Sequence, residues 1–204
     1  GAQMVFQLGS TALELILNAY GYTIVEGMES LQTDPNNFSM FLYAGILAPI
    51  TEEILFRGLI QRSMLPFGKT FAIFVSSFTF GLFHGNLIQS PYAFVVGLVL
   101  GYVAVEYNIL WAMVLHMINN LVISDLPVRV LGGVAGNSIT GLVIWVLAVA
   151  GLIILIRRRH EIRQYVAENK VDNQAVACFF TSPGVIAACA MLMYEMVTNF
   201  ILMQ

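Results

Sequence analysis

The residues of this chain best suited to chemistry are ionisable and amide side chains that lie inside long hydrophobic stretches. They form three short patterns: Glu52-Glu53-x-x-x-Arg57, Phe80-x-x-x-His84 and His116-x-x-x-Asn120. An ionisable group in such surroundings costs several kcal/mol unless it is paired or solvated. Each pattern contains two residues four positions apart, which lie on one face of a helix; in the first pattern these are Glu53 and Arg57. We interpret the three patterns as parts of one functional site.

The two adjacent carboxylates of the first pattern are expected to have different roles. Consecutive residues project about 100 degrees apart on a helix, so Glu52 and Glu53 cannot share a face. Glu53 lies four residues before Arg57, which allows a salt bridge that compensates both charges. Pro49, one turn upstream, removes a backbone donor and can open room for water by kinking the helix. Glu52 is therefore the candidate general base.

The second and third patterns supply groups that could act on a water molecule and on a carbonyl oxygen. His84 is placed to complete a water-binding site beside the base. His116 and Asn120 share a helix face, and both can donate hydrogen bonds to the oxyanion that forms when water attacks an amide. Together the three patterns provide a base, a water ligand and an oxyanion hole, a combination that indicates peptide-bond hydrolysis.

Three other interpretations stay open at this point. A buried Glu–Arg pair, or a membrane histidine or asparagine, can simply fasten two helices together. Glu52, His84 and His116 could instead be zinc ligands around an open fourth position, although the sequence lacks a His-Glu-x-x-His motif. The chain could also bind a peptide without cleaving it, as an immunity protein would. Neither a nucleotide-binding loop nor a metal motif of standard spacing occurs, so we expect no cofactor and no bound metal.

The composition places the chain in a lipid bilayer. Of its 204 residues, 58% are hydrophobic and only 10% are charged, against about 25% charged residues in soluble domains. Crossing the hydrocarbon takes about 20 residues of helix, and the chain has several runs of that length. These runs lack the two-residue alternation of barrel strands. We predict an all-α, polytopic membrane helical bundle with a polar catalytic cavity inside it.

The hydrophobic runs and the turn residues between them predict about seven helical segments. Their ranges are 4–24, 41–62, 70–89, 91–107, 109–124, 138–156 and 176–203. We divide the chain into an N-terminal helix and loop (1–40), core helices with the three patterns (41–124), and C-terminal transmembrane helices with a basic linker at 157–170 (125–204). The fourth and fifth segments are short, so at least one of them is expected not to span the bilayer fully.

The distribution of basic residues predicts the orientation of the helices. Lys and Arg cluster in 62–69 and 157–170, whereas the loop 26–37 has none. The positive-inside rule therefore places the two basic regions in the cytoplasm, with Arg129 as the one discordant charge in a loop. We expect a multi-pass integral protein of the plasma membrane. A separate pattern, Gly97-x-x-x-Gly101, would let another helix approach closely.

The three patterns resemble those of the CPBP membrane proteases. This family includes the CAAX prenyl endopeptidases of the Ras-converting type and the bacterial Abi bacteriocin-processing or immunity proteins. Its motifs, EExxxR, FxxxH and HxxxN or HxxxD, are matched here by Glu52-Glu53-Ile54-Leu55-Phe56-Arg57, Phe80-Gly81-Leu82-Phe83-His84 and His116-Met117-Ile118-Asn119-Asn120. The resemblance covers roughly residues 41–124, and every motif position agrees.

The resemblance implies a metal-independent glutamate protease. Glu52 and His84 would activate the water, Glu53 and Arg57 would support the site, and His116 and Asn120 would hold the oxyanion. The implied partners are the lipid bilayer and a peptide or lipidated-protein substrate, with no nucleic acid. The motifs do not identify the substrate, which could be a CAAX-like protein end or a processed peptide such as a bacteriocin.

Overall fold

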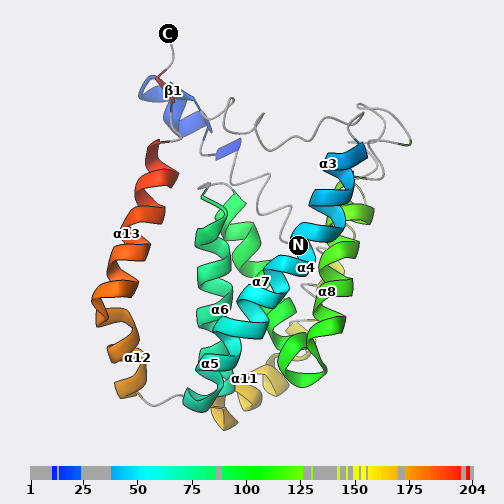
Figure 1. Ribbon diagram of the computed structural model, residues 1–204. Coiled ribbons are helices and arrows are strands. Elements are labelled where there is room, and N and C mark those ends of the chain that lie inside the picture. The colour runs from blue at the N-terminus through cyan, green and yellow to red at the C-terminus, as the bar shows by residue number, and fades with distance from the viewer. Residues whose placement is uncertain are drawn as a thin grey trace.

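A computed structural model gives the fold (Figure 1). It describes residues 11–12, 14–23, 38–85, 89–125, 156–169, 173–198 and 201–202, with isolated positions between 130 and 154. Within these residues the chain is a bundle of helices, as predicted. The first predicted segment is described only in part, with helix at 11–12 and 14–19, and most of the predicted segment 138–156 lies outside the described residues.

The first pattern lies in a continuous helical stretch of 30 residues, Phe38–Phe67, which is longer than predicted. Two π-helical segments, η1 and η2, interrupt its α-helical turns; segments of this kind are often found at functional sites. In order, the stretch consists of α3 (Phe38–Leu42), η1 (Tyr43–Leu47), α4 (Ala48–Glu53), η2 (Ile54–Gln61), α5 (Arg62–Met64) and the 3-10 turn η3 (Leu65–Phe67). Gly68, with φ of 116°, ends it at the predicted turn because its left-handed conformation favours glycine.

Three further helices complete the core: α6 (Lys69–Phe83), α7 (Gln89–Glu106) and α8 (Ile109–Ile118), which continues as the π-helical η4 (Asn119–Asp125). The sequence predicts that the third segment runs to Gln89, which is wrong. The helix ends at Phe83 because His84 caps it and Gly85 follows in the left-handed conformation, φ 60°. As a result His84 lies at the C-terminal end of α6 and not in the middle of a helix.

The C-terminal part differs most from the predicted segments. The basic region assigned to a linker contains a helix, α11 (Arg159–Glu168). The predicted last segment is two helices, α12 (Asn173–Thr181) and α13 (Pro183–Thr198), which bend by 58°. The break falls before Pro183, since proline has no backbone N–H to continue a helix and is favoured in a first turn. A two-residue strand pair, β1 (Tyr22–Thr23) with β2 (Ile201–Leu202), was not predicted.

Small residues allow the core helices to pack closely. A Cβ added at Gly97 would lie 3.1 Å from the Ser77 Cα, and one at Gly81 would lie 2.9 Å from the Ser90 carbonyl oxygen. Both contacts join α6 to α7, so the predicted close approach at Gly97 does occur. Since packing sets the depth of each helix relative to its neighbours, these contacts help fix the level at which the three patterns meet.

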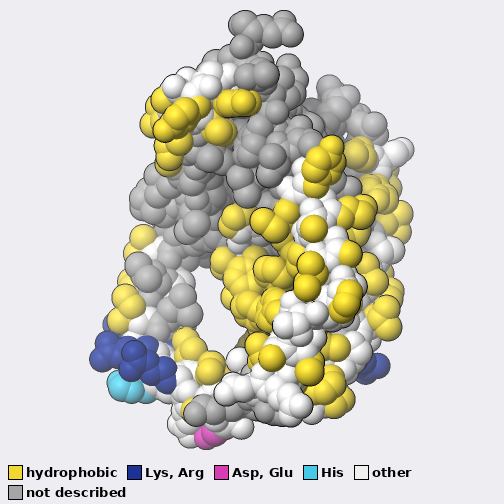
Figure 2. All heavy atoms as spheres, turned by 90° about the vertical axis from the view of Figure 1, so that its left-hand side faces the viewer, with side chains coloured by type: hydrophobic (Ala, Val, Ile, Leu, Met, Phe, Trp, Pro, Cys, Tyr) yellow, Lys and Arg dark blue, Asp and Glu magenta, His cyan; other side chains and the backbone are white. Residues whose placement is uncertain are grey.

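The surface is that of a membrane protein. Among the described residues, Phe38–Phe67 and Gln89–Glu106 are long and apolar enough to cross a bilayer, and the bent pair α12–α13 would make a third span. The helices Lys69–Phe83 and Ile109–Val122 are apolar but shorter, in line with the expectation of a short fifth segment. Figure 2 shows hydrophobic side chains spread over the described part of one face, with Lys and Arg near its lower end.

The basic regions of the sequence meet at that end of the bundle, where α5 and α11 lie (Figure 1). The Lys69 ammonium lies 2.8 Å from a carboxylate oxygen of Glu106 at the end of α7, and the Tyr165 hydroxyl on α11 donates to the same oxygen at 2.8 Å. Burial and the neighbouring carboxylate raise the pKa of Tyr165, which keeps the hydroxyl protonated as a donor. This end is the one that the positive-inside rule assigns to the cytoplasm.

Candidate active site

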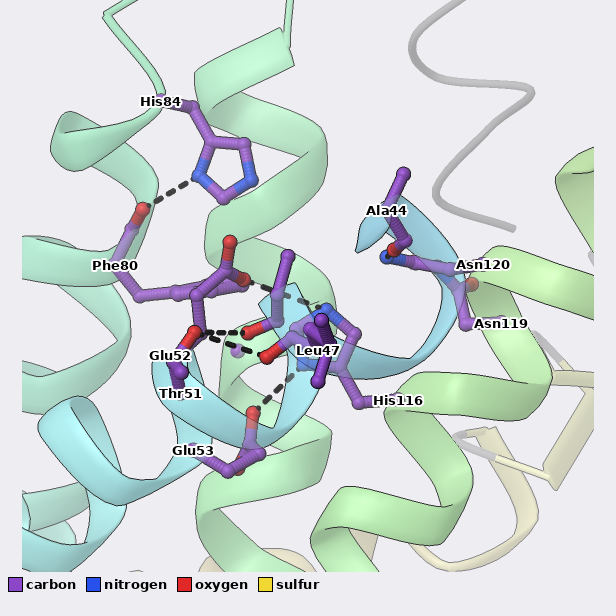
Figure 3. A network of polar contacts seen from close by, with 12 residues as sticks. Ala44, Leu47, Thr51, Glu52, Glu53, Phe80, His84, His116, Asn119 and Asn120 are labelled. Carbon is purple, nitrogen blue, oxygen red and sulfur yellow. Dashed lines mark hydrogen bonds and ion pairs between the residues drawn. The ribbon is translucent and has the colours of Figure 1, made fainter. Parts of the chain in front are cut away.

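Five core segments bring the three sequence patterns together. Glu52 and Glu53 end α4, Arg57 lies one turn later in η2, His84 caps α6, and His116 and Asn120 lie where α8 passes into η4. The site therefore forms in the half of the bundle away from the basic end. Figure 3 shows the side chains of Glu52, Glu53, His84 and His116 converging between these helices.

Glu53 is the buried centre of the charge network. Its side chain is fully inaccessible; one carboxylate oxygen lies 3.2 Å from Arg57 Nε, and the other lies 2.9 Å from His116 Nδ1. The salt bridge to Arg57 is the one predicted from the four-residue spacing. The contact with His116 was not predicted, because it joins residues 63 positions apart. A buried carboxylate needs such compensation, and Glu53 has it on both oxygens.

Glu52 lies on the other side of His116 and faces a cavity. Its carboxylate is 3.7 Å from His116 Nε2, and its side chain keeps 23% of its exposure, whereas that of Glu53 keeps none. Thus the Glu53 carboxylate is fully buried against Arg57 and His116, whereas the Glu52 carboxylate is partly accessible. The two side chains have different surroundings, as the 100-degree offset between neighbours predicted.

The cavity has a volume of about 230 Å³ and is lined by residues from α3, η1, α4, α6, α7, α8 and η4. It is large enough for several water molecules or a short piece of extended peptide. Its lining includes Glu52, His84, His116 and Asn120, so the structure brings the four predicted acting residues to one space. Gln89, Tyr92 and Asn119 line it as well.

His84 has one ring nitrogen held by the backbone. Its Nδ1 lies 2.8 Å from the Phe80 carbonyl oxygen, and because that oxygen can only accept, Nδ1 carries the hydrogen. The neutral ring then presents Nε2 as an acceptor. The four-residue spacing therefore places the Phe80 carbonyl oxygen against the His84 ring, and this contact selects the tautomer with the hydrogen on Nδ1.

The Phe80 ring packs between three of the site's polar groups. It makes edge contacts with the rings of His84, at a centroid distance of 4.8 Å, and His116, at 5.6 Å, and the Arg57 guanidinium lies 4.6 Å from its centroid. The aromatic face stabilises the buried cation, and the edge contacts restrict both imidazoles. An aromatic residue at this position thus spaces the two histidines around the cavity.

Gln61 extends the network beyond the predicted residues. It lies one turn after Arg57. The Gln61 side chain donates to the Gly101 carbonyl oxygen at 2.8 Å, and the Arg57 side chain donates to the Gly97 carbonyl oxygen at 3.1 Å. The two donors and the two glycines have the same four-residue spacing on facing segments. The sequence contains that signal, since Glu53, Arg57 and Gln61 follow one another at intervals of four, but the partner helix became known only from the structure.

Asn120 has a different surrounding from the one expected of a free oxyanion donor. Its Nδ2 donates to the Ala44 carbonyl oxygen at 3.1 Å, and its Oδ1 accepts from Asn119 Nδ2 at 3.1 Å. Asn119 in turn accepts from the Tyr92 hydroxyl at 2.8 Å. Figure 3 shows the two asparagines beside Ala44, at the edge of the cavity. Sequence reasoning found neither Asn119 nor Tyr92.

With respect to metals, no group of three or more His, Cys, Asp or Glu side chains in the described parts of the chain is arranged to hold an ion. Glu106, a carboxylate outside the three patterns, lies at the end of α7, where it contacts Lys69 and Tyr165.

The fold and the site define a membrane helical bundle in which the Glu52 carboxylate, two imidazoles and the Asn120 amide line one cavity. The comparison with protein families is more specific: residues 34–122 match the model of the type II CAAX prenyl endopeptidase Rce1-like family. The matched segment contains all three sequence patterns and confirms the resemblance to the CPBP and CAAX protease family. The comparisons with curated proteins and with solved structures found no match.

Proposed function

We propose that this protein is a membrane-embedded endopeptidase of the glutamate type, which hydrolyses a peptide bond of a membrane-associated peptide or lipidated protein without a metal. One observation supports it above the others: Glu52, His84, His116 and Asn120 line a single cavity inside an apolar bundle. The family match supports the coarser part of the proposal, a CAAX-type membrane protease.

The reaction begins with a water molecule between Glu52 and His84. The Glu52 carboxylate accepts a proton from the water while the unprotonated Nε2 of His84 accepts the second hydrogen bond and orients it. The water oxygen then bonds to the substrate's carbonyl carbon. When the C–N bond breaks, Glu52 returns the proton to the leaving amine, so the enzyme ends in its starting state.

The oxyanion is stabilised by donors from α8 and η4. Because Glu53 accepts from His116 Nδ1, the ring presents an N–H from Nε2 only when both nitrogens are protonated. The charges of Glu52, Glu53, Arg57 and such an imidazolium sum to zero, which suits a buried cluster. Asn120 adds a neutral amide donor. Fixed donors of this kind each contribute about 10²–10³ in rate when they face the developing charge.

Cleavage by purified protein in lipid vesicles tests this assignment. The substrates are quenched fluorescent peptides with a farnesylated cysteine near the carboxyl end, beside a non-prenylated peptide library. Glu52→Gln and His84→Ala are expected to lower kcat by roughly 10²–10⁴, the range for general base catalysis.

Matched controls use the same chemistry away from the cavity. Glu106→Gln changes a carboxylate at the basic end, and His160→Ala removes the exposed histidine of α11; both are expected to keep full activity. Wild-type cleavage by Glu52→Gln would reject Glu52 as the base, and no cleavage of any peptide by the wild-type protein would reject the endopeptidase.

A further inference from the structure

A chain of hydrogen bonds connects three core segments along the wall of the cavity. The Tyr92 hydroxyl on α7 donates to Asn119 Oδ1 at 2.8 Å, Asn119 Nδ2 donates to Asn120 Oδ1 at 3.1 Å, and Asn120 Nδ2 donates to the Ala44 carbonyl oxygen in η1 at 3.1 Å. Both asparagines belong to η4, so the chain runs from α7 through η4 to η1. All four residues line the cavity.

The sequence removes one possible backbone donor from the Ala44 carbonyl. In η1 the helix has π-type hydrogen bonds, as in the bond from the Ala48 N–H to the Tyr43 oxygen, five residues back. By that spacing the donor for Ala44 would be residue 49. Residue 49 is proline, which has no N–H. Asn120 supplies a donor in its place, through a partly buried hydrogen bond.

This series of hydrogen bonds fixes the orientation of the Asn120 amide. An asparagine amide is planar, with one acceptor and two donor hydrogens. Asn119 holds its oxygen and Ala44 takes one hydrogen. The direction of the second N–H, which has no other partner among the described residues, is then determined by the plane.

We propose that Tyr92 and Asn119 are positioning residues, which hold the Asn120 amide so that its second N–H faces the oxyanion. The proposal rests on the proposed function and deepens it. Neither residue needs to touch the substrate: each acts through Asn120. Such preorganisation matters because a donor that must rotate into place during the reaction loses part of its effect.

A double-mutant cycle on kcat separates this role from simple helix fastening. Tyr92→Phe keeps the ring and removes the donor; loss of one neutral hydrogen bond is expected to lower kcat roughly two- to tenfold with KM unchanged. Asn120→Ala is expected to lower it about 10²–10³-fold. In the Asn120→Ala background, Tyr92→Phe should cause no further loss, because nothing is left to position.

The other variants sharpen the result. Asn119→Asp retains an acceptor for Tyr92 but has no N–H for Asn120, so its kcat should fall at least as far as that of Tyr92→Phe. Tyr102→Phe, ten residues along the same helix, is the matched control and should leave kcat unchanged. Multiplicative losses in the double variant, a raised KM in Tyr92→Phe, or wild-type kcat in Tyr92→Phe would each overturn the proposal.

A spectroscopic measurement tests the hydrogen-bond chain even without catalysis. In protein labelled with ¹⁵N-asparagine, the side-chain amide signals of Asn120 are identified by their loss in Asn120→Ala. These signals should shift in Tyr92→Phe and not in Tyr102→Phe; identical signals in both variants would refute the chain itself. Inactive wild-type protein together with a shift would reject the proposed function and keep the positioning contacts.

Discussion

Replacing Glu53 by Gln is expected to cost far more stability than the same replacement at its neighbour Glu52. Glu53 is fully buried and compensates Arg57 Nε at 3.2 Å and His116 Nδ1 at 2.9 Å. Glu53→Gln leaves the Arg57 guanidinium, itself fully inaccessible, without a counter-charge. Breaking a buried pair in this way costs about 3–5 kcal/mol. Glu52→Gln changes a partly exposed group 3.7 Å from its partner, for which we expect roughly 1 kcal/mol or less.

Thermal unfolding of the two variants in the same detergent measures this difference. At about 2–4 °C per kcal/mol for a chain of this size, the melting temperature should fall by roughly 6–20 °C in Glu53→Gln. In Glu52→Gln it should change by only a few degrees. Among the molecules that remain folded, Glu52→Gln should lose more cleavage activity than Glu53→Gln, because Glu52 is the proposed base.

A double variant provides the control. Glu53→Gln combined with Arg57→Met removes both charges and is expected to be more stable than Glu53→Gln alone, because no buried ion is left unpaired. Equal melting temperatures for Glu52→Gln and Glu53→Gln, or a further loss in the double variant, would refute the reasoning that Glu53 is the compensated charge and Glu52 the free one.

Two further predictions concern the metal and the membrane orientation. Exhaustive chelation should leave cleavage unchanged. A loss of activity that added zinc restores would instead support the hypothesis that Glu52, His84 and His116 are zinc ligands. In a variant without Cys178 and Cys189, a cysteine at Ser63 should react with an impermeant maleimide only from the cytoplasmic side, and a cysteine at Phe38, near the cavity end, only from the other side. The reverse pattern would overturn the positive-inside assignment and turn the cavity toward the cytoplasm.

The sequence determined those features that depend on composition and on local helix geometry. A chain with 58% hydrophobic residues and long apolar runs predicts a membrane helical bundle. The Glu53–Arg57 pair also follows from spacing alone, because residues four apart on a helix are neighbours whatever the rest of the chain does. The different surroundings of Glu52 and Glu53 follow from the same geometry.

Helix ends and breaks were predicted less well. The third segment ends six residues earlier than the predicted Gln89, and the last one bends before Pro183. Gly85 is a local signal for the helix end, and Pro183 is a local signal for the bend. A prediction based on hydrophobicity misses them because each lies within a long apolar run. The π-helical form of η1 and η2 has no local sequence signal that we recognise.

Tertiary structure alone decided which side chains meet across helices. His116 lies between Glu53 and Glu52, Gln61 reaches Gly101, and Tyr92 reaches Asn119. Spacing within a helix fixes only the direction of a side chain. Its partner depends on the depth and rotation of the neighbouring helix, which are set by close packing at glycines and by buried polar groups that must find a donor or an acceptor.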